Sequence, residues 1–358
     1  MHKDDLMTPR ERARCLAENR PVDRLPISII FGSAAKQLFA DDLKLLDSKA
    51  EKMAEVQIKI YETLGVDGLE VFYGLNTFAK IYGAEMTNPE VGSPAVVTHP
   101  MKSLADLEMV DPDMFTVAKE ENVAVCRDAL RIIQERVGDE VPYGMGFPGP
   151  FTAASSLLGS EKLLRAIHRR PDELHQLLSR LNTALINMAA DFLREDIPVS
   201  ISDPVASGTI LSAKQFDKFV KPYAREFIDA CQKIRPYGVG VHICGDTTNI
   251  LQNMVDCGYS SLSLDNLVDL AVAKEKIGSQ VPFSGNVPPV EIMTLGTKEQ
   301  IEEAVKDCFR KAADSPCGFT INTGCDCSPL APLENAFIYM EAARRCAKYP
   351  YKAENLDW

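Results

Sequence analysis

Short apolar runs recur along the chain, and amphipathic stretches of helical period separate them. The runs end in Gly, Asp, Asn or Ser, as strands of parallel βα units do. We predict eight strands, at residues 26–32, 65–72, 142–147, 199–204, 239–245, 260–266, 281–287 and 318–325. Alternation of eight strands with helices favours a (β/α)₈ TIM-type barrel, whose functional site lies at the carboxyl ends of its strands. A doubly wound open sheet is the alternative fold.

The helical period is clearest at residues 212–234, where large apolar side chains repeat every three or four positions. Further helices are predicted at residues 248–257, 298–313 and 333–347. The segment of residues 76–140 is longer than one crossover, and residues 86–100 within it have the pattern of a hairpin. We therefore predict one barrel domain over residues 1–358, with a helical extension before strand 1 and an elaborated segment between strands 2 and 3.

Composition and charge narrow the functional classes. The 358 residues are 46% hydrophobic, enough for a full core. Lys and Arg number 39 and Asp and Glu 51, so the formal net charge is −12, and no basic cluster offsets it. Such a field repels nucleic acid and anionic membranes, so we expect neither as a partner.

The ten cysteines are scattered along the chain instead of forming the dense framework of a small secreted domain. The first residues contain no apolar signal-like stretch, and no run of 18 apolar residues follows. We expect a cytoplasmic protein with reduced thiols, which are available as metal ligands.

Three residues form the candidate metal site. His242 and Cys244 are two apart on the predicted fifth strand, so both side chains lie on one face of it. Cys325 ends the eighth strand, and all strand ends of a closed barrel surround one opening. One imidazole and two thiolates suit tetrahedral zinc and leave the fourth position open for a substrate.

Two other interpretations of these residues stay open. His242 could be a hydrogen-bonded interior histidine, with the cysteines serving as small core residues, which is their usual fate. Cys327 could instead complete a closed structural zinc site of one His and three Cys, although structural sites usually draw their ligands from compact knuckles.

Further polar residues end neighbouring strands. Asp203 and Asp265 are candidate catalytic carboxylates, or caps of the helices that follow them. Candidate substrate-binding residues that would line the cavity are Tyr73, Asn76, Met145, Phe147 and Asn286. The alternatives for these five are core packing and ordinary turn chemistry.

Several segments together resemble the uroporphyrinogen decarboxylase superfamily, and more closely its zinc-dependent corrinoid methyltransferase branch. They are TPRERARCLAENRPVDRLPISI, GPFTAASSLLGSEKLL, DPVASGTILSAKQF, HICGDTTNIL, SGNVPP and NTGCDCSPLAPLEN, in order through nearly the whole chain. That branch includes methylcobalamin:coenzyme M methyltransferases and O-demethylase components. The resemblance implies a (β/α)₈ barrel and zinc held by His242, Cys244 and Cys325, with Asp265 or a water in the fourth position.

The same resemblance separates two activities. Porphyrinogen decarboxylases have an Arg-rich motif near the first strand and a His where Cys325 stands, and this chain has neither. A polycarboxylate substrate needs cationic partners, so decarboxylation is disfavoured. The sequence also lacks a D-x-H-x-x-G stretch for cobalt. The expected function is methyl transfer between a small thiol or methoxy or methyl substrate and a corrinoid on a separate protein. The alternatives are a metal-free decarboxylase and a non-catalytic barrel with structural zinc.

Overall fold

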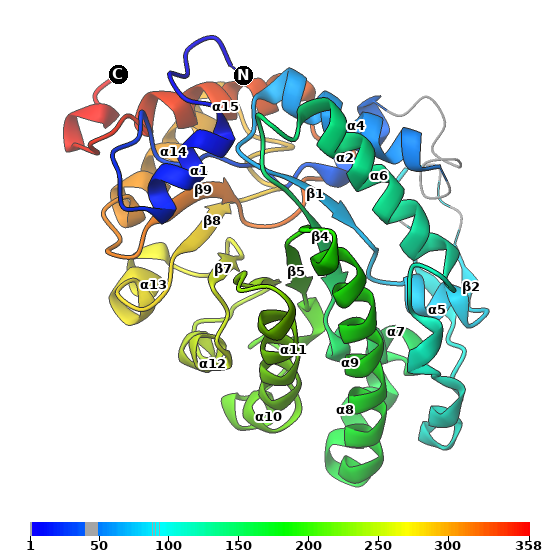
Figure 1. Cartoon of the computed structure of the whole chain (residues 1–358). Helices are drawn as coiled ribbons and strands as arrows, with labels where there is room; N and C mark the ends of the chain where they lie inside the picture. Colours follow the sequence, from blue (N-terminus) through cyan, green and yellow to red (C-terminus); the bar gives the residue numbers. More distant parts are fainter. Residues whose placement is uncertain (1, 40–48, 88, 90, 93) are drawn as a thin grey trace. The chain divides into compact units, whose positions relative to one another are not determined.

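The computed structural model describes residues 2–39, 49–87, 89, 91–92 and 94–358. Seven strands form one sheet in the order β1-β4-β5-β6-β7-β8-β9, and helices intervene along the chain (Figure 1). The strands are β1 (Leu69–Phe72), β2 (Glu85–Met86), β3 (Val96–Thr98), β4 (Tyr143–Pro148), β5 (Val199–Ser202), β6 (Gly240–Ile243), β7 (Ser261–Leu264), β8 (Phe283–Val287) and β9 (Phe319–Thr323). This sequential order, with parallel pairing, is the topology of a (β/α) barrel and confirms the predicted fold class.

The helices cover the predicted crossovers and the additions to them. The α-helices are α1 (Pro9–Ala17), α2 (Gly32–Phe39), α4 (Ala50–Leu64), α5 (Thr77–Ile81), α6 (Glu121–Val137), α7 (Pro150–Leu158), α8 (Ser160–Arg169), α9 (Pro171–Arg194), α10 (Ala213–Phe219), α11 (Lys221–Ile234), α12 (Leu251–Cys257), α13 (Leu270–Ile277), α14 (Lys298–Ala312) and α15 (Leu333–Cys346). Short 3₁₀ helices are η1 (Leu104–Met109), η2 (Pro112–Met114), η3 (Pro204–Ala206) and η4 (Ala353–Leu356). The predicted helical extension is α1, which begins with a capping box between Thr8 and Glu11.

The first predicted strand is an extended segment with a single parallel bridge, from Ile27 to Ile321 of β9. On its other side, the Ile27 carbonyl accepts a hydrogen bond from the Asp67 N–H, just before β1. Side chains interrupt its ladder, because the Asp67 carboxylate and the Thr323 hydroxyl accept from the Ile27 and Ile30 N–H groups. The segment therefore takes the eighth strand's place between β9 and β1 without regular strand pairing.

Two further sequence expectations have definite outcomes. The helix predicted at residues 212–234 is two helices, α10 and α11, and Pro222 stands in the first turn of α11, where it has no N–H to continue a helix from α10. The hairpin in the elaborated segment is present, because β2 pairs antiparallel with β3 through Glu85 and Thr98.

Several strands of the sheet alternate apolar and polar side chains. On β8 and β9 the buried positions include Phe283 and Phe319, and Phe319 packs edge-on against Phe309 of α14. The alternate positions, Ser284 and Thr320, are half-buried and point away from that helix. β5 and β6 alternate in the same way, with buried Ile201 and Val241 between Ser and His positions.

The chain forms two compact units. Unit 1 comprises Met1–Val71, Asp128–Gly144 and Ser261–Trp358; unit 2 comprises Phe72–Arg127 and Met145–Ser260. Unit 1 contains a buried ionic cluster in which Arg12 binds Asp23 and Asp67 at 2.7 Å, and Arg24 binds Asp5 and Asp67 at 2.7 and 2.5 Å. The cluster links Arg12 of α1 to Asp67, whose carboxylate accepts a hydrogen bond from the first extended segment at Ile27. The single-domain prediction stays a prediction.

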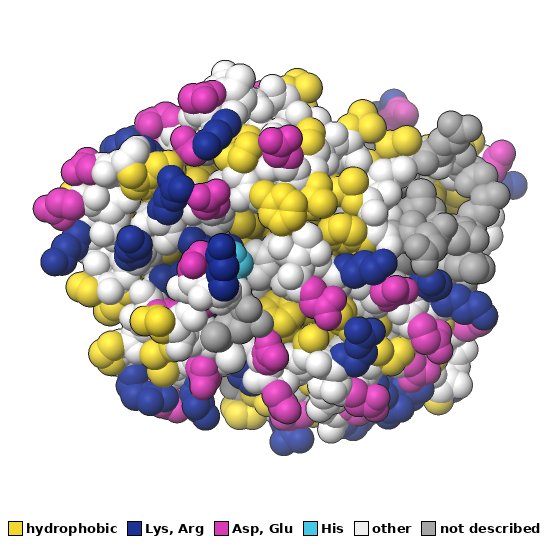
Figure 2. Space-filling model, turned by 90° about the horizontal axis from the view of Figure 1, so that it is seen from above, with side chains coloured by type: hydrophobic (Ala, Val, Ile, Leu, Met, Phe, Trp, Pro, Cys, Tyr) yellow, Lys and Arg dark blue, Asp and Glu magenta, His cyan; other side chains and the backbone are white. Residues whose placement is uncertain are grey.

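The surface carries charges of both signs. On the face shown in Figure 2, Lys and Arg side chains alternate with Asp and Glu around hydrophobic side chains. Among the described residues, no helix has the length and apolar character needed to span a membrane.

Candidate metal centre

His242 and Cys244 are presented by the carboxyl end of β6. His242 pairs in register with Ser202 of β5, and Cys244 directly follows the last strand residue, Ile243. Val241 and Ile243 are buried on the other face, so His242 and Cys244 share the polar face and are half-buried. The His242 Nε2 atom lies 3.2 Å from the Cys244 Sγ atom. The two side chains thus have the common orientation that their spacing predicts.

Cys325 lies in the loop after β9, two residues beyond the end of the strand, and not at the strand end as predicted. The backbone of the loop is held on both sides of Cys325. The Gly324 N–H donates to the Val287 carbonyl at 2.8 Å, and the Cys327 N–H donates to the Ile30 carbonyl at 2.8 Å. Gly324 packs so closely on the next loop that a Cβ would lie 2.4 Å from the Asn266 nitrogen. Only glycine fits there.

A carboxylate next to Cys325 completes this support. Asp326 accepts hydrogen bonds from the Ser33 N–H at 3.2 Å and from the Ser33 hydroxyl at 2.5 Å, at the start of α2. Burial raises the pKa of Asp326, and the bonds from Ser33 oppose that shift. We define this pair as the Asp326–Ser33 clamp. Sequence reasoning missed it, because its partners are 293 residues apart and no spacing pattern relates them.

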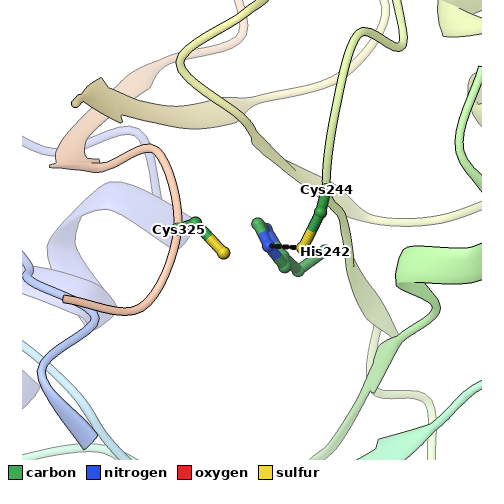
Figure 3. A group of neighbouring side chains, drawn as sticks. All are labelled: His242, Cys244 and Cys325. Atoms are coloured by element: carbon green, nitrogen blue, oxygen red, sulfur yellow. Dashed lines mark hydrogen bonds between the residues drawn. The ribbon is translucent and has the colours of Figure 1, made fainter. Parts of the chain in front are cut away.

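The three predicted ligands come together. One ligand atom from each of His242, Cys244 and Cys325 lies within 4.8 Å of the others, and Figure 3 shows the side chains pointing toward one another. Among the described residues, no other set of three or more His, Cys, Asp or Glu side chains is grouped in this way. Tetrahedral zinc with these ligands requires separations of about 3.6–3.8 Å between ligand atoms. The donor set and the spacing therefore fit zinc after small side-chain shifts.

Cys327 has a different environment. It is 1% exposed and does not belong to the group. Burial raises the pKa of its thiol well above the ordinary range. Its burial beside the first extended segment favours a packing role.

Asp203 has the capping role, although for a different helix from the one that follows it. The carboxylate accepts from the N–H and hydroxyl of Thr152 at 2.8 and 2.6 Å, in the first turn of α7. The cap position itself is Gly149, whose missing side chain leaves the space that Asp203 fills. Asp203 is 1% exposed, and burial raises its pKa to about 6, with the Thr152 bonds opposing the shift. This environment favours a structural role over the predicted catalytic one.

Asp265 and Asn286 both lie in unit 1, near the carboxyl ends of β7 and β8. Asp265 accepts from the Leu267 N–H at 3.0 Å, which is a local turn bond, and it is not among the three grouped ligands. The Asn286 amide donates to the carbonyls of Asp265 and Val268 at 2.9 and 2.6 Å. Asn286 therefore fixes the loop after β7, and its contact with substrate stays a prediction.

The remaining predicted cavity residues are in unit 2, and three of them pack in its core. The Phe147 ring contacts Phe192 of α9 and Tyr73, so this side of β4 faces the helices, and Met145, two residues away, shares that face. The Tyr73 hydroxyl donates to Glu120 at 3.0 Å. These contacts favour core packing for the three residues, and their predicted place in a substrate cavity stays a prediction.

Asn76 differs from those three, because it is half-buried and lies just before α5. Its amide donates to the Pro94 carbonyl at 3.2 Å, which ties it to the segment that leads into β3. A contact with substrate stays a prediction for this residue.

Comparison with known proteins identifies the family of this chain and several of its relatives. The family model of uroporphyrinogen decarboxylase (URO-D) matches residues 8–346. The chain belongs to this family. It is 26% identical over 335 residues to methylcobamide:CoM methyltransferase MtaA of Methanosarcina barkeri, which covers 92% of this chain and 95% of that relative. A solved methyltransferase from Methanosarcina mazei superposes with a TM-score of 0.82 at 25% identity, covering 94% of this chain and 98% of that one.

The family also contains decarboxylases. Uroporphyrinogen decarboxylase 2, chloroplastic, of Oryza sativa subsp. japonica is 28% identical over 303 residues, which covers 82% of this chain and 74% of that protein. Membership of the URO-D family therefore does not distinguish methyl transfer from decarboxylation. The side chains at the site are needed to distinguish them.

Proposed function

We propose that this chain is a zinc-dependent methyltransferase that moves a methyl group between a small thiol or methoxy or methyl substrate and the cobalt of a corrinoid on a separate protein. The grouping of His242, Cys244 and Cys325 is the observation that carries the proposal. Support comes from the methyltransferases among the relatives, whose alignments span more than nine-tenths of the chain.

The metal ligands and the residues that hold the Cys325 loop have different roles in this proposal. His242, Cys244 and Cys325 would hold Zn²⁺ and leave one position for the substrate. At that position zinc supplies Lewis acidity, which lowers the pKa of a substrate thiol or makes a methoxy oxygen a better leaving group. The Asp326–Ser33 clamp and the two backbone bonds keep the Cys325 loop in place.

The runner-up is a decarboxylase without metal, which the Oryza relative represents. A site for a polycarboxylate would need cationic side chains, whereas the grouped residues here are two thiols and an imidazole. The donor set therefore favours zinc and methyl transfer.

Zinc content and a methyl-transfer assay test the proposal. We expect near-stoichiometric zinc in the purified protein. We also expect a spectral change with methylcobalamin or cob(I)alamin against at least one member of a panel of thiols, methyl ethers, methanol and methylamines. Cys325→Ser removes a ligand and should lower both zinc affinity and rate by more than the roughly 10- to 100-fold that loss of a residue supporting a ligand costs.

Two cysteine variants serve as controls. Cys317→Ser changes an exposed thiol and should behave as wild type. Cys327→Ser should keep its zinc if the site has three protein ligands. A protein without zinc, or a Cys325→Ser variant with unchanged zinc, would refute the proposal.

A further inference from the structure

A row of polar side chains lies on the face of β8 and β9 that points away from the helices. Ser284 and Thr320 are register partners on these strands, and Asn322 is two residues further along β9 on the same face as Thr320. Phe319 and Ile321 occupy the opposite face, where Phe319 contacts Phe309 of α14. We call Ser284, Thr320 and Asn322 the polar strip.

The polar strip has unused hydrogen-bond donors. Neither the Ser284 nor the Thr320 hydroxyl has a hydrogen-bond partner among the described residues. Both side chains are half-buried. Asn322 is 8% exposed, and its oxygen accepts from the Thr323 N–H at 2.9 Å. Its NH₂ group donates to no described residue and is not among the fully buried unpaired atoms, so it remains open to a partner from outside the chain.

The register partner of Asn322 is a second amide, whose hydrogen bonds are made within the chain. Asn286 is paired with Asn322 across the two strands, and it is buried to the same extent. The Asn286 NH₂ group, however, donates to two backbone carbonyls. The Asn286 oxygen also accepts from the Cys308 thiol of α14 at 3.8 Å, so this amide is engaged on the helix side of the sheet, whereas the Asn322 NH₂ has no described partner.

The strip lies within reach of the proposed metal ligand on the same strand and loop. Asn322 precedes Cys325 by three residues, so their Cα atoms are at most about 11 Å apart. Thr320 is about 7 Å further back along β9. A small molecule of several bonds can therefore reach from the polar strip to an atom beside Cys325.

The chemistry of the strip defines the group it would accept. Hydroxyl and amide donors are neutral, and the strands β7, β8 and β9 contain no Lys or Arg. An anionic group would require a charge-assisted partner for strong binding. Oxygen acceptors without charge, such as a hydroxyl, carbonyl or ether oxygen, match these donors.

We propose that the polar strip is a substrate subsite that binds an uncharged, oxygen-bearing end of the small methyl donor or acceptor. The identity of the opposite, reacting end rests on the proposed function. The binding preference of the strip does not, so the two claims are measured separately.

Calorimetric binding to the full chain as purified tests the subsite. The probes are ω-mercaptoalcohols of two to six carbons, the alkanethiols that have a methyl group in place of the hydroxyl, and ω-mercaptocarboxylates. We expect one chain length at which the mercaptoalcohol binds about tenfold more tightly than its alkanethiol, as one added hydrogen bond to a buried donor provides. The carboxylates should bind no better than the alkanethiols.

Isosteric variants assign the preference to the strip. Asn322→Leu should remove the preference for the alcohol and leave alkanethiol binding unchanged, and Thr320→Val provides a second variant if Asn322→Leu does not fold. Asn253→Leu on α12 is the matched control and should keep the preference.

Three results would overturn the subsite: no preference or no binding at any length, a preference that survives in both strip variants, or tightest binding of the carboxylates. A protein that keeps the preference but transfers no methyl group would refute the proposed function and leave the subsite standing.

Discussion

At the residue scale, the position of Cys325 depends on neighbours that its own strand does not provide. The residue is in a loop, and its placement relies on Gly324, on the backbone bond of Cys327 and on the Asp326–Ser33 clamp. Period-two alternation predicted the common face of His242 and Cys244, because both are governed by one short strand. No such rule covers a loop, which explains why the sequence located Cys325 only approximately and did not reveal Asp326.

The clamp leads to a prediction about metal affinity. Asp326→Ala frees the loop beside Cys325 and should weaken zinc binding about 10- to 100-fold, as loss of a residue that orients a ligand does. Competition with a chromogenic chelator measures the change. Ser33→Ala removes only the hydroxyl bond and should have a smaller effect in the same direction. Equal zinc affinity in all three proteins would show that the clamp does not position the ligand.

At the scale of elements, local pattern predicted most of the barrel, and side-chain interference accounts for the exceptions. β6, β8 and β9 lie within the predicted ranges because each alternates buried and polar positions. The first strand lost its regular pairing because Asp67 and Thr323 side chains take two of its N–H groups. The helix predicted at residues 212–234 divides near Pro222. The apolar period continues there, but proline has no N–H to continue the helical hydrogen bonds.

The direction in which a strand side chain points also limited the prediction of the site. Met145 and Phe147 were expected in the cavity because they end a barrel strand. Their face packs against α9 instead, through the contact of Phe147 with Phe192. A sequence shows which residues share a face, but with buried residues on both sides it does not show which face is inside.

The cap that Asp203 provides for α7 can be tested at the scale of elements. Asp203 follows β5 and accepts a hydrogen bond from the first turn of α7. Asp203→Ala should lower the free energy of unfolding by about 1–2 kcal/mol, the usual value of a lost cap. Asp203→Asn keeps an acceptor for the Thr152 N–H and should retain the methyl-transfer rate within a few-fold. Urea unfolding and the spectral assay measure the two quantities. A rate loss of about 100-fold in Asp203→Asn, with stability preserved, would instead support the predicted catalytic role.

At the scale of the whole molecule, the buried ionic cluster of unit 1 connects the N-terminal extension to the barrel strands. Arg12 and Arg24 bind three aspartates, Asp5, Asp23 and Asp67, at side-chain exposures below one-tenth. Loss of one partner leaves a buried charge uncompensated. Arg12→Met should therefore lower the free energy of unfolding by about 3–5 kcal/mol, as urea denaturation would measure. A loss below about 1 kcal/mol would show that the pairs add little.

The same cluster makes stability depend on acid pH. Burial alone would raise the pKa of Asp23, but the bonds from Arg12 outweigh it and lower the pKa to about 2. A lowered pKa means that the ionised form stabilises the fold above the ordinary pKa of the carboxyl, and that this contribution is lost as the pH falls toward 2. The stability difference between wild type and Asp23→Asn should be constant above about pH 4 and shrink between pH 4 and 2. Unfolding curves across that range measure it, and a difference independent of pH would contradict the assignment.

The central claim is a zinc ion with three protein ligands and one position for substrate. X-ray absorption at the zinc edge, recorded before and after adding a thiol substrate, tests it most directly. We expect two sulfur and two lighter ligands in the free protein and three sulfur ligands once the thiol is bound. A zinc sphere that stays the same after thiol addition, or a protein without zinc, would contradict it.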